Sequence, residues 1–159
     1  MPIDSSAFND VTRLILGGAI EVHRTLGPGL LESIYMPCLR FELAARKLRF
    51  VVQRSIPILY KGMPLDARYD VDLIVEDLVV VEVKSVSTLL PVHQSQTLTY
   101  MRLTECPAGL LINFNVPRLM DGVKRLINPR AGGRGADGGS GSGGDGGNGI
   151  TPGNEAAEN

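Results

Sequence analysis

Residues 78–84 have the sequence Leu78-Val79-Val80-Val81-Glu82-Val83-Lys84, which is the most informative segment for predicting the fold. A nearly continuous apolar run of this length is typical of a strand that is covered on both faces of a sheet. Side chains alternate in direction along a strand, so Glu82 and Lys84 point to one face, about 7 Å apart along the chain. Burying an acid and a base there costs free energy unless they form an internal ion pair or bind something else.

The preceding segment, residues 69–75, predicts a second strand whose side chains alternate between the two faces of the sheet. One face carries Tyr69, Val71, Leu73 and Val75, and the other carries Asp70, Asp72 and Ile74. In an antiparallel hairpin Asp72 lies across from Glu82 if the loop consists of residues 76–78. A two-residue turn would instead pair Asp72 with Val81, and the two acids would face opposite ways. The register of this hairpin therefore decides whether two carboxylates converge beside one ammonium group.

The segments around this hairpin predict an α/β protein. Apolar residues at helical spacing indicate helices over residues 8–26 and 33–48, and Pro37 predicts that the second helix starts late or kinks. Its expected buried positions are Ile34, Cys38, Leu39 and Leu43. Further strands are expected over residues 50–60, 109–114 and 123–127, and a helix over residues 93–104. This order predicts a sandwich with a mixed central sheet flanked by helices.

The composition indicates one globular domain followed by a tail. The chain has 159 residues, of which 43% are hydrophobic and 21% charged, and this excludes a disordered or collagen-like protein. Twelve of the 19 glycines lie between Gly132 and Gly153. Such a segment cannot bury enough apolar surface to fold, so we expect a domain over residues 1–130 and a disordered Gly-rich tail over residues 131–159.

Charge and cysteine content exclude several classes of protein. Residues 1–130 hold 15 basic and 13 acidic residues, so any affinity for phosphate must come from a local site rather than from bulk charge. Cys38 and Cys106 are too few for a disulfide framework, a structural zinc site or an iron-sulfur cluster. The sequence shows no secretory signal and no apolar run of 18 residues. We therefore expect a cytoplasmic protein that does not associate with a membrane.

A cluster of carboxylates beside a lysine predicts metal-dependent chemistry on a phosphate. Asp72 and Glu82 supply the oxygen ligands that Mg²⁺ or Mn²⁺ prefers, and such an ion keeps several waters for a phosphate substrate. Lys84 could orient the attacking water or stabilise the charge that develops on phosphorus. Hydrolysis of a phosphodiester is the expected reaction.

Three motifs in this order resemble a known family. They are Gly29-Leu30-Leu31-Glu32-Ser33-Ile34-Tyr35, then Asp72 followed by Glu82-Val83-Lys84, and then Gln96-Thr97-Leu98-Thr99-Tyr100. Together they resemble the PD-(D/E)XK nuclease superfamily, and the first resembles the motif of its bacterial GxxExxY branch. The resemblance implies a restriction-endonuclease-like α/β fold and a metal-dependent nuclease that acts on DNA.

The resemblance also implies a role for individual residues. It makes Asp72, Glu82 and Lys84 the catalytic residues. The implied metal ligands are Asp72, Glu82, the Val83 carbonyl and Glu32, the last either directly or through a water. The residues implied to position the substrate are Gln96 and Tyr100. His93 shares their helix face, since residues three or four apart are neighbours. His23 would lie either at the metal or simply at a helix C-terminus, whose dipole stabilises a protonated imidazole. Tyr35 is expected to pack and orient rather than to react.

Two other functions remain open from the sequence. The chain could be a nuclease-fold module with little or no activity that works with a protein partner, because it is small and nearly neutral. The substrate could also be RNA, although four Tyr, four Phe and no Trp offer little for the stacking that RNA-recognition modules use. Homo-oligomer formation is not determined by these patterns.

Overall fold

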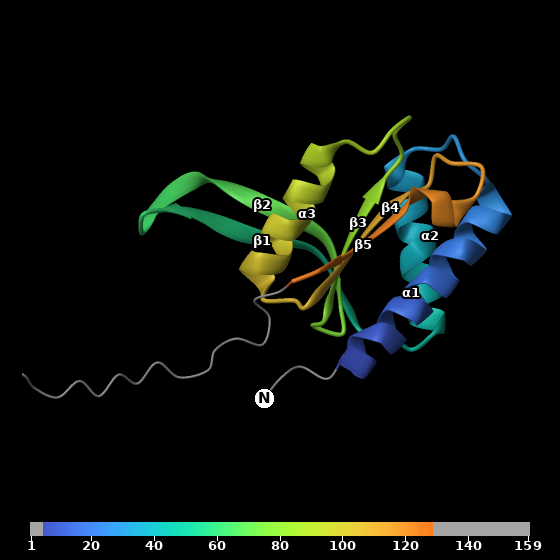
Figure 1. The fold of residues 1–159 in the computed structure, drawn as a ribbon, viewed down its shortest axis with the longest axis horizontal. Coiled ribbons are helices and arrows are strands. Elements are labelled where there is room, and N and C mark those ends of the chain that lie inside the picture. The colour runs from blue at the N-terminus through green and yellow to red at the C-terminus, as the bar shows by residue number, and fades with distance from the viewer. Residues whose placement is uncertain (1–4, 129–159) are drawn as a thin grey trace, which may run out of the picture.

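A mixed five-stranded sheet with helices on both faces forms the body of the protein (Figure 1). The computed structural model describes residues 5–128, so the predicted tail over residues 131–159 lies outside the described residues. In chain order the elements are α1 (Ser5–Leu26), α2 (Glu32–Ala45), β1 (Phe50–Tyr60), β2 (Met63–Val75), β3 (Val79–Lys84), α3 (Pro91–Thr104), β4 (Ala108–Asn113), η1 (Leu119–Gly122) and β5 (Val123–Ile127). The predicted α/β sandwich is confirmed.

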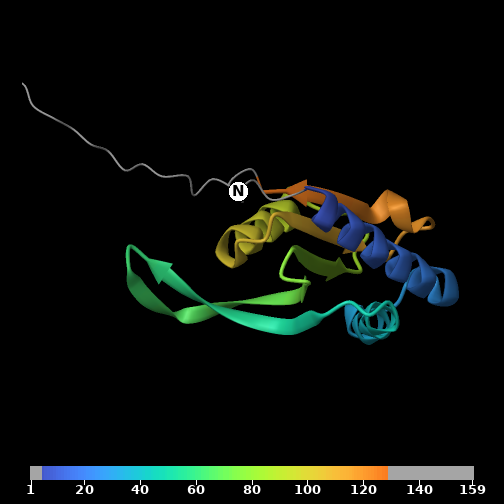
Figure 2. The ribbon, with the colours of Figure 1, turned by 90° about the horizontal axis from the view of Figure 1, so that it is seen from below.

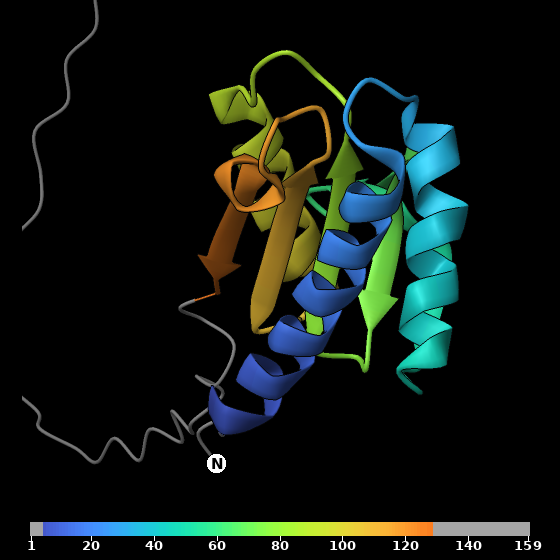
Figure 3. The ribbon, with the colours of Figure 1, turned by 90° about the vertical axis from the view of Figure 1, so that its right-hand side faces the viewer.

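The strands lie in the order β1-β2-β3-β4-β5, and only β3 and β4 run parallel. Helices α1 and α2 cover one face of the sheet, and α3 covers the other (Figure 3). Val79, Val81 and Val83 of β3 pack in the core beneath α1 and α2, whereas Val80 packs in the smaller core beneath α3. Strand β3 is therefore buried on both faces, as its apolar run predicts, and Glu82 shares the α3 face with Val80.

The hairpin of β2 and β3 has the register that brings the two acids together. Val75 pairs with Val79 and Leu73 with Val81, which leaves a three-residue turn over residues 76–78. Glu76 and Asp77 adopt the left-handed conformation, with φ of 53° and 55°. The side chain of Glu76 accepts hydrogen bonds from the backbone and guanidinium of Arg49, and these contacts hold the turn. The alternative two-residue turn is excluded.

Strand β2 differs from its predicted alternation. Tyr69 and Val71 pack in the α3 core together with Ile74, not in the core of Leu73 and Val75. The cause is an irregularity beside Asp72. Val52 pairs with Leu73 and Arg54 with Val71, but Gln53 between them forms no ladder pair and adopts a φ of 47°. Beyond it the two strands form a hairpin arm, residues 54–70, that extends past the rest of the sheet (Figures 1 and 2).

Helix α2 corrects two expectations about its sequence. It begins at Glu32 and continues through Pro37, so the predicted late start is wrong. Pro37 is exposed and lies in the second turn, where its missing N–H removes one backbone hydrogen bond. The buried residues are Tyr35, Leu39 and Leu43, whereas Ile34 is 44% exposed. None of the helices within residues 5–128 is long and apolar enough to cross a membrane.

Gly122 permits a close backbone approach that the fold requires. A Cβ atom at this position would lie 2.2 Å from the carbonyl oxygen of Asn113, at the end of β4. We expect Gly122→Ala to lower the free energy of unfolding by about 2 kcal/mol, because backbone must move to relieve this overlap. The control is Gly17→Ala in α1, whose Cβ would meet only the Arg46 side chain at 3.7 Å. Urea denaturation measures both, and equal effects would contradict the prediction.

Candidate active site

Asp72 and Glu82 lie side by side on the α3 face of the sheet, and we call them the carboxylate pair. The backbone N–H of Asp72 donates to Glu82 Oε1 at 3.1 Å, and the N–H of Val83 donates to Asp72 Oδ2 at 2.9 Å. The two side chains therefore bond the backbone of each other's strands directly beyond the last ladder pair, Leu73 with Val81. This exchange holds both carboxylates in place without help from a loop.

Burial and mutual repulsion make the carboxylate pair difficult to ionise fully. Glu82 is only 3% exposed, and its burial together with the charge of Asp72 raises its pKa to about 8. Burial also raises the pKa of Asp72, although the Val83 N–H and Lys84 oppose this shift. Two acids that repel each other in a buried setting are stabilised in their charged forms by a nearby cation.

Lys84 contributes charge to the site without forming an ion pair. It lies two residues after Glu82 on the same strand and is half-buried. Its charge lowers the pKa of both acids of the carboxylate pair. However, none of the ion pairs within 4.0 Å among residues 5–128 includes Lys84. The simple internal ion pair, the structural alternative for this strand, is therefore not formed.

Ser85 attaches the first turn of α2 to the end of β3, and the sequence analysis missed it. Its N–H donates to Glu32 Oε1 at 3.3 Å, and its hydroxyl donates to the carbonyl oxygen of Leu30. Glu32 is exposed, and its charge raises the pKa of Asp72. The carboxylate of Glu32 therefore acts on Asp72 through its field, while its hydrogen bond goes to the backbone.

Asn113 is a second residue that the sequence analysis missed. It is 2% exposed and lies at the end of β4. Its side chain accepts from the N–H of Val86 at 3.1 Å and donates to the Val86 carbonyl at 2.9 Å. These two bonds hold the segment that follows Lys84. The one available signal was a polar residue at the end of an otherwise apolar strand.

The carboxylate pair fits a divalent metal ion, but the predicted three-acid cluster does not form. Within residues 5–128, no group of three His, Cys, Asp or Glu side chains is placed to hold a metal. Glu32 is therefore not brought into a common ligand set with Asp72 and Glu82. Mg²⁺ needs only one or two carboxylates, since waters and substrate phosphates complete its shell. Asp72 and Glu82 alone satisfy this requirement.

Gln96 and Tyr100 lie together on α3, beside the carboxylate pair. Gln96 Nε2 donates to the Tyr100 hydroxyl at 2.8 Å. Burial, followed by the charge of Glu82, raises the pKa of Tyr100. The Tyr100 ring also meets the ring of Tyr69 edge to face, with centroids 5.6 Å apart. The predicted pairing of these two residues on one helix face is thus present in the fold.

Three other candidate residues form hydrogen bonds to nearby backbone groups. His93 Nδ1 accepts from the N–H of Leu90 and so caps the start of α3. His23 is buried in the last turn of α1, which matches the helix-terminus alternative, and its Nε2 donates to the Val116 carbonyl at 2.7 Å. Tyr35 is fully buried, donates to Gly27 O at 2.6 Å and accepts from Leu30 N at 3.1 Å, consistent with an orienting position.

Comparison with known proteins agrees with this geometry. The family model of the PD-(D/E)XK nuclease superfamily matches residues 9–126, which span the whole sheet except the last residue of β5. Neither a curated protein nor a solved structure matches the chain. A match over most of the chain, together with a carboxylate pair and a lysine on adjacent strands of a mixed sheet, establishes that the chain belongs to the PD-(D/E)XK nuclease superfamily.

Proposed function

We propose that this protein is a metal-dependent nuclease that hydrolyses phosphodiester bonds in DNA by a metal-activated water. The observation that carries the proposal is the carboxylate pair with Lys84 on one face of adjacent strands. Membership of a superfamily that generally comprises nucleases supports the reaction class. Free Cys38 and Cys106 fit a reducing compartment, so we propose that the protein acts in the cytoplasm.

The residues of the site divide the chemistry between them. Asp72 and Glu82 would hold Mg²⁺ or Mn²⁺, with the Val83 carbonyl as a further ligand. When bound, the ion would lower the pKa of a water and neutralise charge on the phosphate. Lys84 has no ion-pair partner within 4.0 Å among residues 5–128, so its ammonium is available to orient the water and to stabilise the transition state.

Substrate positioning is assigned to the α3 side of the site. Gln96 and Tyr100 lie on the helix that covers this face and can contact the DNA backbone, whereas His93 can do so only through Nε2, since Nδ1 caps the helix. We also place the chain in the GxxExxY branch. The support is that Glu32 and Tyr35 occupy the first turn of α2, where Tyr35 ties down the preceding loop.

A cleavage assay tests the proposal directly. Supercoiled plasmid, labelled single-stranded DNA and labelled RNA are each incubated with the full chain and Mg²⁺ or Mn²⁺. We expect metal-dependent cleavage of DNA that Asp72→Asn abolishes, because this variant keeps the side-chain shape but removes a charge. Equal cleavage by the wild type and Asp72→Asn would reject the nuclease proposal. Preferential cleavage of RNA would reject DNA as the substrate.

One observation favours a second candidate, a catalytically weak module that works through a protein partner. The hairpin arm exposes apolar side chains far from any core, with Leu59 62%, Tyr60 58% and Met63 56% exposed. Exposed apolar groups on a projecting element are typical of contact surfaces between proteins. Calorimetric titration with Mn²⁺ separates the candidates, because a module without catalysis need not bind the ion. Saturable Mn²⁺ binding that Asp72→Asn removes would favour the nuclease.

Glu32 provides a graded test of the site. Its carboxylate bonds to the backbone of Ser85 and acts on Asp72 through its field. We therefore expect Glu32→Gln to lower the DNA cleavage rate by about tenfold, far less than loss of a direct metal ligand. Mn²⁺ affinity and cleavage rate are measured on the same preparation. Complete loss of Mn²⁺ binding in Glu32→Gln would show that Glu32 is a direct ligand after all.

A further inference from the structure

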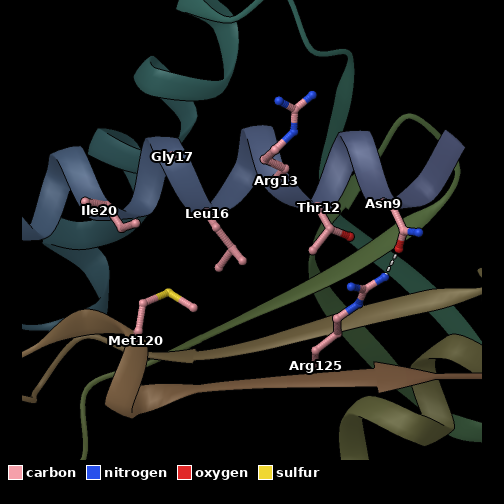
Figure 4. Close-up of a pocket in the computed structure, with 8 residues that line it drawn as sticks. All are labelled: Asn9, Thr12, Arg13, Leu16, Gly17, Ile20, Met120 and Arg125. Carbon is pink, nitrogen blue, oxygen red and sulfur yellow. Dashed lines mark hydrogen bonds between the residues drawn. The ribbon is translucent and has the colours of Figure 1, made fainter. Parts of the chain in front are cut away.

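A pocket of about 540 Å³ lies between α1, η1 and β5 (Figure 4). Because α1 and α3 cover opposite faces of the sheet, the pocket lies on the face opposite the carboxylate pair. This volume is in the range of pockets that hold small molecules. The residues that line it are Asn9, Thr12, Arg13, Leu16, Gly17, Ile20, Met120 and Arg125. Neither the carboxylate pair nor the Gln96–Tyr100 pair contributes to it, so the nuclease site does not account for this pocket.

The lining is divided into a polar end and an apolar end. Figure 4 shows Asn9, Thr12 and Arg125 at one end, and Ile20 and Met120 at the other. Helical spacing produces this division, because residues 9, 13, 16 and 20 follow one side of α1. A ligand that fills the pocket therefore needs one polar group and one apolar part.

The polar end carries positive charge. Arg125 donates one hydrogen bond to Asn9 Oδ1 and lies 5.7 Å from the centre of the Phe8 ring. A guanidinium has five N–H donors, so donors remain for an anion. Arg13 also lines the pocket, although its guanidinium meets Asp10 at 3.1 Å on the surface. The charge at this end thus favours an acid as the ligand's polar group.

Thr12 supplies an independent sign of a ligand. It is 3% exposed, lines the pocket, and its hydroxyl has no hydrogen-bond partner among residues 5–128. In Figure 4 this hydroxyl points toward the end where Asn9 and Arg125 meet. A buried hydroxyl without a partner costs free energy, and an acceptor atom beside Arg125 would remove that cost.

The pocket suits a small molecule better than a peptide. The backbone groups of α1 along the pocket belong to a continuous helix and are bonded within it. The apolar end therefore offers nothing to satisfy the amides of a bound chain, and unpaired amides would oppose binding. A ligand with a single polar group avoids this penalty.

We propose that the pocket binds a small amphipathic carboxylate, such as a medium-chain fatty acid. Its carboxylate accepts hydrogen bonds from Arg125 and the Thr12 hydroxyl. Its hydrocarbon chain lies along Leu16, Ile20 and Met120, where it removes apolar surface from water. The site is separate from the carboxylate pair, and binding needs neither metal nor nuclease activity.

Titration of the isotope-labelled full chain with sodium octanoate, followed by NMR, tests this proposal. We expect saturable one-to-one binding with a Kd below about 1 mM, the range for a ligand of ten non-hydrogen atoms. Backbone shifts should gather at Leu16, Gly17 and Met120 rather than at Asp72. Octan-1-ol and octylammonium match the chain length but lack the negative charge, so each should bind at least about tenfold more weakly.

Substitutions at each end localise the binding. Arg125→Gln should weaken octanoate binding about tenfold, whereas the control Lys124→Gln should not. Leu126, two residues after Lys124, packs on the α3 face, so strand alternation places Lys124 on that face too, away from the pocket. Ile20→Trp should fill the apolar end and prevent binding. Leu14→Trp is its control, since Leu14 is similarly exposed on α1 but does not line the pocket.

A third substitution addresses the hydroxyl. Thr12→Val keeps the side-chain shape and should both weaken octanoate binding by several-fold and raise the unfolding temperature of the free protein. The proposal is overturned if octanoate does not saturate the wild type, or if octan-1-ol binds equally well. It is also overturned if Arg125→Gln and Lys124→Gln bind octanoate alike. Tighter binding of an acidic amphipathic peptide at the same residues would replace the small carboxylate with a peptide partner.

Discussion

Lys84→Met is expected to lower the rate of DNA cleavage by about 10² to 10³-fold while leaving Mn²⁺ binding intact. Lys84 lies on the same strand face as Glu82 and has no ion-pair partner within 4.0 Å among residues 5–128. Its ammonium can therefore act on the reacting phosphate, and removing one such positive group from a transition state has effects of this size. Methionine retains most of the length and apolar character of the lysine stem.

The effect of Lys84→Met on metal affinity separates this role from a structural one. Lys84 lowers the pKa of both carboxylates by its positive charge, and the same charge repels a divalent cation bound to them. Removing Lys84 should therefore not weaken the binding of the ion. The measurement is Mn²⁺ affinity by calorimetry alongside a cleavage time course. Lys61→Met at the exposed tip of the hairpin arm is the matched control. If Lys84→Met cleaved DNA at the wild-type rate, Lys84 would have no role in the reaction.

The sequence predicted the central hairpin for physical reasons that act locally, and it left the register open between a two-residue and a three-residue turn. The apolar run over residues 78–84 identifies a strand buried on both faces, and Glu76-Asp77 supplies polar residues for the turn. Once the turn has three residues, period-two alternation places Asp72 and Glu82 on one face. The α3 pair Gln96 and Tyr100 was equally predictable, because residues four apart share a helix face.

What the sequence did not reveal depends on contacts between distant segments. Ser85 bonds Leu30, which is 55 residues away, and Asn113 bonds Val86, which is 27 residues away. No periodicity signals such contacts. The Val116 partner of His23 was not foreseen for the same reason, since it is 93 residues away. The switch of Val71 to the α3 core depends on an irregularity at Gln53 that the alternating pattern of β2 does not contain.

Glu82→Gln should abolish both Mn²⁺ binding and DNA cleavage, yet the metal-free variant should be at least as stable as the wild type at pH 8. The amide keeps an oxygen that accepts the Asp72 N–H, as Glu82 does at 3.1 Å. What disappears is a buried negative charge that repels Asp72. An acid whose negative charge stabilised the fold would behave differently, because its replacement would lower the stability of the protein at pH 8.

The pH dependence of the metal-free protein makes this prediction sharper. Burial and the charge of Asp72 raise the pKa of Glu82 to about 8 from an ordinary value of 4.5. A raised pKa in the folded state stabilises the fold below pH 4.5, and this contribution is lost as the pH rises through about 8. In EDTA, the unfolding temperature of the wild type should therefore fall between pH 5 and about pH 8, whereas that of Glu82→Gln should fall less.

Added Mn²⁺ should reverse this loss of stability in the wild type alone. A cation that binds only the folded protein raises its unfolding temperature by mass action, and binding requires the charged carboxylate pair. Glu82→Gln should show no such rise, and Glu21→Gln on the surface of α1 should respond like the wild type. If Mn²⁺ stabilised Glu82→Gln as strongly as the wild type, the ion would bind somewhere other than the carboxylate pair. The chemistry proposed for Asp72, Glu82 and Lys84 would then have no metal to support it.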